Sequence, residues 1–309
     1  MKYAIEINNL NKIYSPNKKN NSAISALSNV NLKIKKGSFF GLLGPNGAGK
    51  STIINILSGL VNKTSGDVKI CDLDIEQYKQ LAKYKIGIVP QEITFDPFFT
   101  VYETLEIYAG YYGIKKSQRK TKEIIKAMGL SDKSKSKPRN LSGGMKRRLL
   151  IAKSLVHSPE ILVLDEPTAG VDVDLRNQLW DYVKKLNKSG TTILLTTHYL
   201  EEAEQLCDEI AVINKGKVIA HDKKDKLMNI LSQKELIISV NNIAKLNLNI
   251  SGTKINKISN DKFSINYDPN IISVETILSS LAKEKISIND ISTAQPDLEE
   301  IFKYLVKSN

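Results

Sequence analysis

A glycine-rich loop, GPNGAGKST from Gly44 to Thr52, most strongly limits how this chain folds. It follows a short apolar run, Phe39 to Leu43, and precedes apolar residues at helical spacing between Ser51 and Leu60. The pattern G-x-x-x-x-G-K-[ST] between a strand and a helix is typical of a phosphate-binding loop, because its backbone N–H groups and the helix dipole both favour an anion. A glycine turn that precedes Lys-Ser by chance is the alternative, and it leaves the flanking strand and helix unexplained.

The side chains of the loop have distinct expected roles. Lys50 is expected to reach the β and γ phosphates of a nucleotide, and the Ser51 hydroxyl to ligate Mg2+. The nucleotide-binding residues predicted from the loop are Gly44, Pro45, Asn46, Gly47, Ala48, Gly49, Lys50, Ser51 and Thr52.

Four further polar side chains follow three apolar strands. The strand ILVLDE ends in Asp165 and Glu166. We expect Asp165 to hold Mg2+ and Glu166 to act as the general base for the attacking water. An apolar strand often ends in acidic residues by chance. The catalytic roles of this pair are therefore predicted because the phosphate loop occurs in the same chain. His198 follows ILLTT, and Gln91 ends IGIVPQ; we expect His198 to contact the γ phosphate and Gln91 to bond metal and water. A structural histidine and a surface amide are the alternatives.

The order of these patterns predicts an α/β fold. Residues 3–10 and 30–34 alternate as an antiparallel entry sheet, and 161–164 and 192–196 are apolar strands separated by a helix at 173–187. A helical subdomain is expected at about 92–155, inserted in the nucleotide-binding domain of residues 1–222. Residues 223–309 are expected to form a small α+β domain, with a charged helix at 221–232, a strand at 235–242, a hairpin around 259–262 and helices at 274–282 and 298–306.

Composition excludes several other classes of protein. The 309 residues are 41% hydrophobic, which is ordinary for a globular chain, and the apolar runs are far shorter than the roughly 20 residues of a membrane span. The two cysteines have no metal-ligand spacing, which favours a reducing compartment. The net charge of +12 is concentrated in residues 1–50 (+7) and 101–150 (+9); solvated surface charge and a basic face for an anionic partner both remain open.

A second glycine-containing segment, NLSGGMKRRLLIA from Asn140 to Ala152, leads into a basic helix. Six segments occur in a characteristic order and spacing: GPNGAGKST, Gln91, LSGGM, ILVLDEP, AGVD and TTH. In this respect the chain resembles the ATPase subunits of ABC transporters over residues 1 to about 222. The surrounding residues, and the ending QPDLEEIFKYL, resemble the ABC-2 exporter branch, in particular the YadG-like multidrug and polysaccharide export ATPases.

The resemblance implies a P-loop ATPase that binds ATP and Mg2+ between two head-to-tail subunits. Ser142, Gly143 and Gly144 would contact the nucleotide of the partner, Asp172 would cross the interface, and Tyr14 would stack on adenine unless it is a strand-face core residue. Because no motif is degraded, a homodimer is expected. The resemblance also implies an integral ABC-2 type permease as partner and a place on the cytoplasmic face of the inner membrane.

The helical insertion supplies the expected docking surface for that permease. We favour FDPFFTVYETL at 95–105, and an ordinary core cluster of its aromatic residues is the alternative. A soluble ABC ATPase that acts on nucleic acid or ribosomes is the alternative function, supported only by the +9 block, and no nucleic-acid partner is expected. A kinase or GTPase with the same phosphate loop leaves LSGGM unexplained.

Overall fold

The protein is described from a computed structural model, in which residues 2–16, 22–168, 171, 173–230, 234–241, 250–284, 286–294 and 296–307 are placed. The chain divides into two compact units, and the division falls between Lys224 and Asp225. Each unit has its own sheets and its own core, so each is described separately.

A six-stranded sheet forms the centre of the first unit, and all its neighbouring strands are parallel except the pair β9 and β10. In spatial order the strands are β10 (Lys217–Lys223), β9 (Glu209–Asn214), β3 (Phe39–Leu43), β8 (Thr192–Thr196), β7 (Ile161–Asp165) and β6 (Ile86–Val89). The apolar runs predicted as strands are therefore confirmed. In β3 and β8 every residue is buried, as expected for parallel strands covered on both faces.

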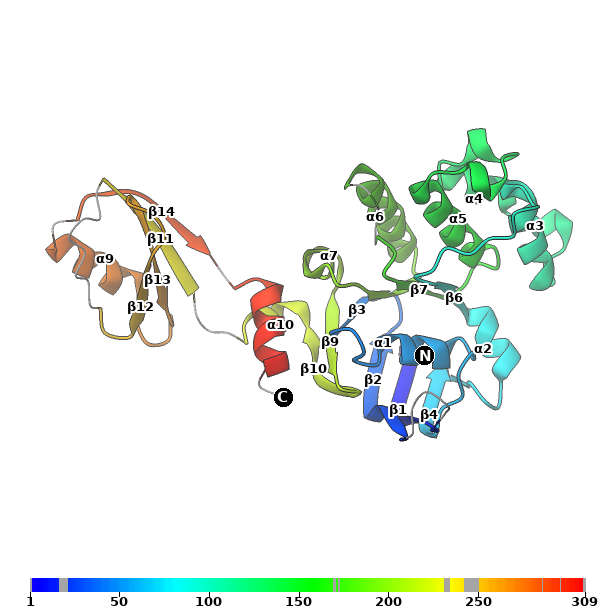
Figure 1. The fold of residues 1–309 in the computed structure, drawn as a ribbon, viewed down its shortest axis with the longest axis horizontal. Helices are drawn as coiled ribbons and strands as arrows, with labels where there is room; N and C mark the ends of the chain where they lie inside the picture. The colour runs from blue at the N-terminus through cyan, green and yellow to red at the C-terminus, as the bar shows by residue number, and fades with distance from the viewer. Residues whose placement is uncertain are drawn as a thin grey trace. The chain divides into compact units, whose positions relative to one another are not determined.

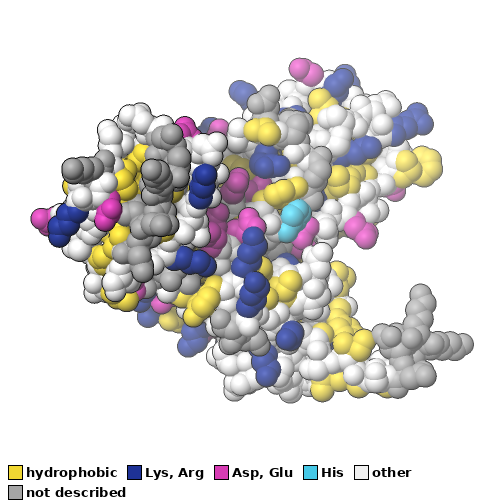
Figure 2. Space-filling model, turned by 60° about the vertical axis from the view of Figure 1, so that its left-hand side comes forward, with side chains coloured by type: hydrophobic (Ala, Val, Ile, Leu, Met, Phe, Trp, Pro, Cys, Tyr) yellow, Lys and Arg dark blue, Asp and Glu magenta, His cyan; other side chains and the backbone are white. Residues whose placement is uncertain are grey.

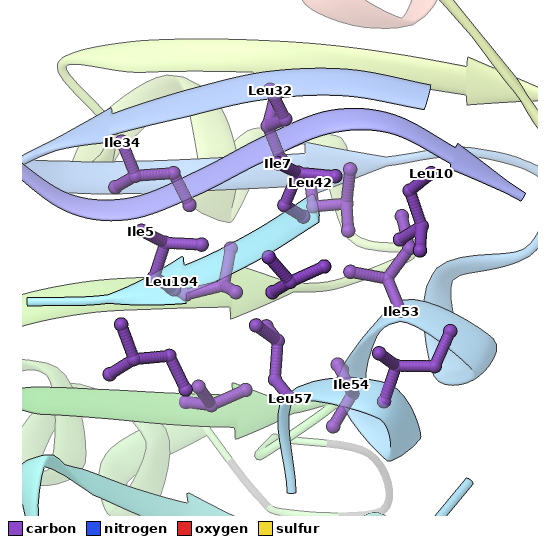
Figure 3. Close-up of a cluster of buried hydrophobic side chains, with 14 of the residues drawn as sticks. Ile5, Ile7, Leu10, Leu32, Ile34, Leu42, Ile53, Ile54, Leu57 and Leu194 are labelled. Carbon is purple, nitrogen blue, oxygen red and sulfur yellow. The ribbon is translucent and has the colours of Figure 1, made fainter. Parts of the chain in front are cut away.

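A four-stranded antiparallel sheet packs against this centre. Its strands, in spatial order, are β2 (Ile24–Lys35), β1 (Tyr3–Tyr14), β4 (Ser65–Ile70) and β5 (Leu73–Asp74). The entry sheet is confirmed, although both of its first strands are longer than predicted. Figure 3 shows side chains of β1 and β2, such as Ile7 and Leu32, packed over β3, β8 and helix α1 (Lys50–Leu57) in one apolar cluster.

The helix after the glycine loop is shorter than predicted. It ends at Leu57 rather than Leu60, because Gly59 has a φ of 72° and takes the chain out of the helix. Short helix α2 (Lys79–Lys85) then leads into β6. Residues 17–21, which make up most of the predicted NKKNNS loop, lie outside the described residues.

The predicted helical insertion is confirmed between β6 and β7. It contains α3 (Val101–Tyr111), α4 (Thr121–Ala127) and α5 (Gly143–Leu155), and Figure 1 shows them grouped on the side of the sheet where β6 and β7 lie. The Thr100 hydroxyl and the Glu103 carboxylate form a capping box at the start of α3. After β7 and β8 come α6 (Val173–Lys188) and α7 (Leu200–Leu206), which cover the sheet as crossover helices.

The second unit is a small α+β fold. Its sheet is antiparallel throughout, and its elements are β11 (Lys234–Val240), β12 (Thr253–Lys257), β13 (Lys262–Tyr267), α9 (Val274–Lys283), β14 (Ile288–Ala294) and α10 (Leu298–Lys307). The predicted hairpin lies between β12 and β13. The charged helix predicted from His221 is wrong in its first part, because His221 to Lys223 pair with β9. Within residues 221–230, the described part of that prediction, the helix is α8 (Lys224–Met228).

Candidate nucleotide-binding site

The glycine loop emerges at the carboxyl edge of the parallel sheet. Strand β3 lies between β8 and β9, and the loop joins it to α1. A Cβ on Gly44 would lie 2.4 Å from the carbonyl oxygen of Ile213, so the loop can pass this strand only with glycine there. Gly49, with a φ of 112°, turns the chain into α1.

Lys50 lies inside the loop that it closes. Its side chain is buried, and its Nζ donates to the carbonyl oxygens of Gly44 at 2.6 Å and Pro45 at 3.1 Å. Burial lowers the pKa of this ammonium, while the carboxylates of Glu166 and Asp165 oppose the shift. An ammonium has three N–H donors, and two are used within the described residues, so the third suits a phosphate oxygen.

Three strand ends converge on the carboxylate of Glu166. Its Oε2 accepts a hydrogen bond from Gln91 Nε2 at 2.9 Å and lies 3.3 Å from Nδ1 of His198. The backbone of Glu166 has a φ of 47°, and its N–H donates to the Thr196 carbonyl at 3.0 Å. The registers of β6, β7 and β8 bring these residues to one edge, as expected where ligands bind in open α/β sheets.

Asp165 is the last residue of β7. Its Oδ1 accepts a hydrogen bond from the Thr196 hydroxyl at 2.5 Å. Burial raises the pKa of the carboxyl, partly offset by that hydrogen bond. One oxygen is thereby oriented, and Oδ2 has no hydrogen-bond partner among the described residues.

The structure brings most predicted site residues to one cavity of about 570 Å³. Its lining consists of Ala26, Asn46, Gly47, Ala48, Gly49, Lys50, Ser51, Thr52, Gln91, Glu166 and His198. The phosphate loop and the three strand-end side chains therefore face the same space.

Other predicted residues lie elsewhere. Tyr14, at the end of β1, is 37% exposed with Lys12 Nζ 4.7 Å from its ring centre, so the strand-face core alternative is wrong. Neither Tyr14 nor the segment Ser142 to Gly144 lines the cavity. Ser142 instead caps α5, where its Oγ accepts from the Met145 N–H at 3.3 Å. Asp172 lies outside the described residues.

Two buried charged residues beside the cavity were missed from the sequence. Arg147 of α5 donates to the carbonyl oxygens of Pro90 and Glu166, both at 2.7 Å. Glu202 of α7 accepts from the hydroxyls of Thr168 at 3.0 Å and Thr197 at 2.9 Å. The signal for Arg147 is its helical spacing from buried Leu150 and Ile151, which places it on the apolar face. Glu202 resembles an ordinary first-turn acid, and no pattern distinguishes it.

Comparisons with known proteins identify the class that this fold and cavity define. The family model described as ABC transporter matches residues 27–169. The chain is 38% identical to the linearmycin resistance ATP-binding protein LnrL of Bacillus subtilis over 88% of this chain and 91% of that protein. It is also 38% identical to the Nod factor export ATP-binding protein I of Cupriavidus metallidurans over 73% of each.

Solved structures agree with these relatives. An ATP-binding subunit of an ABC transporter superposes with a TM-score of 0.66 at 25% identity, covering 73% of this chain and 92% of that chain. A dimeric ATP-binding cassette in a post-hydrolysis state, bound to ADP and Pi, superposes with a TM-score of 0.64 at 29% identity, covering 71% and 98%.

The chain belongs to the ATP-binding subunits of ABC transporters. It is a P-loop ATPase that binds and hydrolyses ATP, and subunits of this family dimerise and work with membrane permeases. Within the residues that the structure describes, no helix has both the length and the hydropathy of a membrane span.

Proposed function

We propose that this chain is the motor subunit of an ABC-2 type exporter, acting as a homodimer on the cytoplasmic face of the inner membrane. The observation that carries the proposal is the convergence of Gln91, Glu166 and His198 on the cavity that holds Lys50. The relative named for Nod factor export supports the direction of transport.

Within the cavity the side chains divide the chemistry of hydrolysis. Glu166 takes the proton of the attacking water, and Gln91 and His198 fix that carboxylate and the water beside it. Lys50 neutralises charge that develops on the transferred phosphoryl group. Positioning and charge neutralisation are the main tasks, because the transition state is loose.

The oxygen donors beside the loop fit Mg2+. Ser51 and Gln91 line the cavity, and Asp165 retains a carboxylate oxygen that Thr196 does not use. Hydroxyl, amide and carboxylate oxygens are the ligands that this hard cation prefers. Bound there, Mg2+ would supply positive charge to the phosphate oxygens.

The signature segment would complete the cavity of a second subunit. Ser142, Gly143 and Gly144 stand at the N-terminus of α5, a helix of 13 residues, and do not face their own cavity. Their N–H groups and the helix dipole would bind the γ phosphate held by the partner, while Asp172 would cross the interface and Tyr14 would stack on adenine.

The subunit arrangement is tested by complementation. Ser142→Arg and Lys50→Ala chains, each inactive alone, are expected to regain one working site when mixed, because each supplies what the other lacks. ATP hydrolysis by purified mixed dimers measures the effect. Mixed dimers without any recovered activity would show that the signature segment does not act across subunits.

The permease would dock on residues 95–105. Phe98 is 74% exposed, and Phe99 and Tyr102 are also exposed, while Val101 and Leu105 are buried. These three aromatic side chains therefore face outward, whereas Phe95 is half-buried. Phe98→Ser with Phe99→Ser is expected to abolish co-purification with the permease in detergent. ATP binding by the isolated chain should remain unchanged, which separates docking from nucleotide chemistry.

The nucleic-acid alternative gains no support. The face drawn in Figure 2 carries Lys and Arg side chains together with Asp and Glu side chains. The relatives described above carry the names of resistance and export proteins.

A further inference from the structure

Arg147 is a buried arginine that has no carboxylate partner among the described residues. It is 3% exposed and lies in the second turn of α5. Burial of a guanidinium is costly unless its N–H groups are used. Their partners therefore indicate what the residue is retained for.

The hydrogen bonds of Arg147 join the ends of two catalytic strands. Nη1 donates to the carbonyl oxygens of Pro90 at 2.7 Å and Gln91 at 3.1 Å, just after β6. Nη2 donates to the carbonyl oxygen of Glu166 at 2.7 Å, just after β7. Carbonyl groups just beyond a strand no longer bond to neighbouring strands, so they need other hydrogen-bond donors. The rigid guanidinium of arginine has several N–H donors and can bond to several carbonyls at once.

The backbones held in this way carry the two side chains that meet in the cavity. Gln91 Nε2 donates to Glu166 Oε2 at 2.9 Å. Glu166 is in the left-handed region, with a φ of 47°, which a non-glycine residue keeps only when its surroundings fix it. Its N–H is bonded to the Thr196 carbonyl and its carbonyl to Arg147, so both sides of the residue are held.

We infer that Arg147 is a positioning residue that sets Gln91 and Glu166 of its own chain and links them to the signature segment at the start of the same helix. Arg147 follows Ser142 by five positions, about 7 Å along a helix. Under the proposed function, Ser142 serves the partner's nucleotide while Arg147 serves this chain's catalytic carboxylate. Movement of α5 when the partner binds ATP is thus transmitted to the chain's own site.

The neighbouring Arg148 supplies a matched control. It stands on the same helix, and its Nη1 donates to the carbonyl oxygen of Met128, just after α4 and away from the strand ends. Methionine keeps most of the length of arginine and removes every donor. Arg147→Met and Arg148→Met therefore remove the same groups from adjacent positions.

The first measurement needs neither nucleotide nor dimer. In the full chain without ATP, Arg147→Met should raise amide hydrogen exchange at least fivefold in residues 87–93 and 164–168 and leave 39–43 unchanged. Arg148→Met should raise it near 126–131 only. Equal exchange in wild type and Arg147→Met at both strand ends would overturn the inference.

The second measurement separates positioning from binding. Arg147→Met should lower kcat at least tenfold and change the Kd for ATP less than twofold, and Arg148→Met should change neither more than twofold. If Arg147→Met does not fold, Arg147→Lys, which keeps the charge but not the fork, should give an intermediate kcat. A normal kcat in the folded variant would contradict the inference.

The third measurement tests which site Arg147 serves. In a dimer with Ser142→Arg on one chain, the working site is the one on that chain's own phosphate loop. Arg147→Met added to the Ser142→Arg chain should remove about nine-tenths of the remaining activity, and on the other chain less than half. The reverse pattern, or equal losses, would overturn own-chain positioning.

If the Ser142→Arg reference dimer keeps full activity, the proposed arrangement of the subunits is wrong. The hydrogen-exchange result still decides whether Arg147 holds the strand ends.

Discussion

The phosphate loop and the strand-end cluster lie on one cavity but are built differently. The loop is a run of consecutive residues whose shape comes from glycine conformations and from Lys50 bonded to two of its own carbonyls. The cluster brings Gln91, Glu166 and His198 together from three strand ends. Buried Arg147 of α5 donates to the carbonyl oxygens of Gln91 and Glu166, and buried Glu202 of α7 accepts from threonines near Glu166 and His198 in the chain. A local motif carries its geometry in its sequence, whereas the cluster needs distant residues to hold it.

The largest expected effect comes from the carboxylate at the centre of the cluster. Glu166→Gln should lower ATP hydrolysis by roughly 10² to 10⁴, the usual contribution of a general base, and leave ATP binding intact. An ATP-dependent dimer should accumulate, measured by size-exclusion chromatography. Glu160→Gln, the same change just before the other end of β7, should keep wild-type turnover. Wild-type turnover in Glu166→Gln would remove this residue from catalysis.

Alanine substitutions at Gly49 and Gly143 separate the local geometry of the phosphate loop from the proposed contact of Gly143 with the partner subunit. Alanine at Gly49 would adopt a φ of 112° and place Cβ 2.7 Å from Leu27 Cδ2, so Gly49→Ala should lose ATP binding and about 2 kcal/mol of stability. At Gly143 nothing lies within 4 Å of the added Cβ. Gly143→Ala should therefore keep the melting temperature and ATP binding of the wild type and lose turnover about tenfold. Equal melting temperatures for both variants would contradict the contrast.

A substitution at Glu202 tests whether this buried residue of α7 helps to position the strand-end cluster of Gln91, Glu166 and His198. Glu202→Met leaves the hydroxyls of Thr168 and Thr197 without their acceptor, and these residues flank Glu166 and His198 in the chain. We expect a five- to tenfold lower kcat and about 1–2 kcal/mol less stability. Glu201→Met on the exposed side of α7 is the control and should change neither quantity. A lower stability with a normal kcat would make Glu202 structural only.

These differences explain what the sequence could and could not predict. The apolar strands and the glycine loop were predicted because buried parallel strands and phosphate loops have contiguous patterns. The end of α1 was misplaced because one glycine outweighs the apolar spacing around it. The roles of Arg147 and Glu202 were missed because periodicity does not identify their partners, which are backbone carbonyls and threonine hydroxyls. Helical spacing indicates only that Arg147 lies on the apolar face of α5.

The smallest expected effect concerns the start of β7, opposite the catalytic end. Glu160 accepts from Lys85 Nζ at 2.6 Å and Lys36 Nζ at 3.1 Å, and these lysines hold the pKa of its carboxyl down to about 2. A lowered folded-state pKa stabilises the fold above the unfolded pKa, and this contribution is lost as the pH falls towards about 2.

The side chain of Glu160 is 43% exposed, so solvent screening limits the effect. Glu160→Gln should cost about 0.5 kcal/mol at pH 7, measured by urea unfolding. The difference should shrink as the pH falls from about 4.5 to about 2, because the carboxyl of the unfolded wild-type chain is protonated in this range while that of the folded chain still carries its charge. It should also shrink in 1 M salt. A loss that is independent of pH and salt would instead indicate that packing, rather than the ion pairs, stabilises this end of the strand.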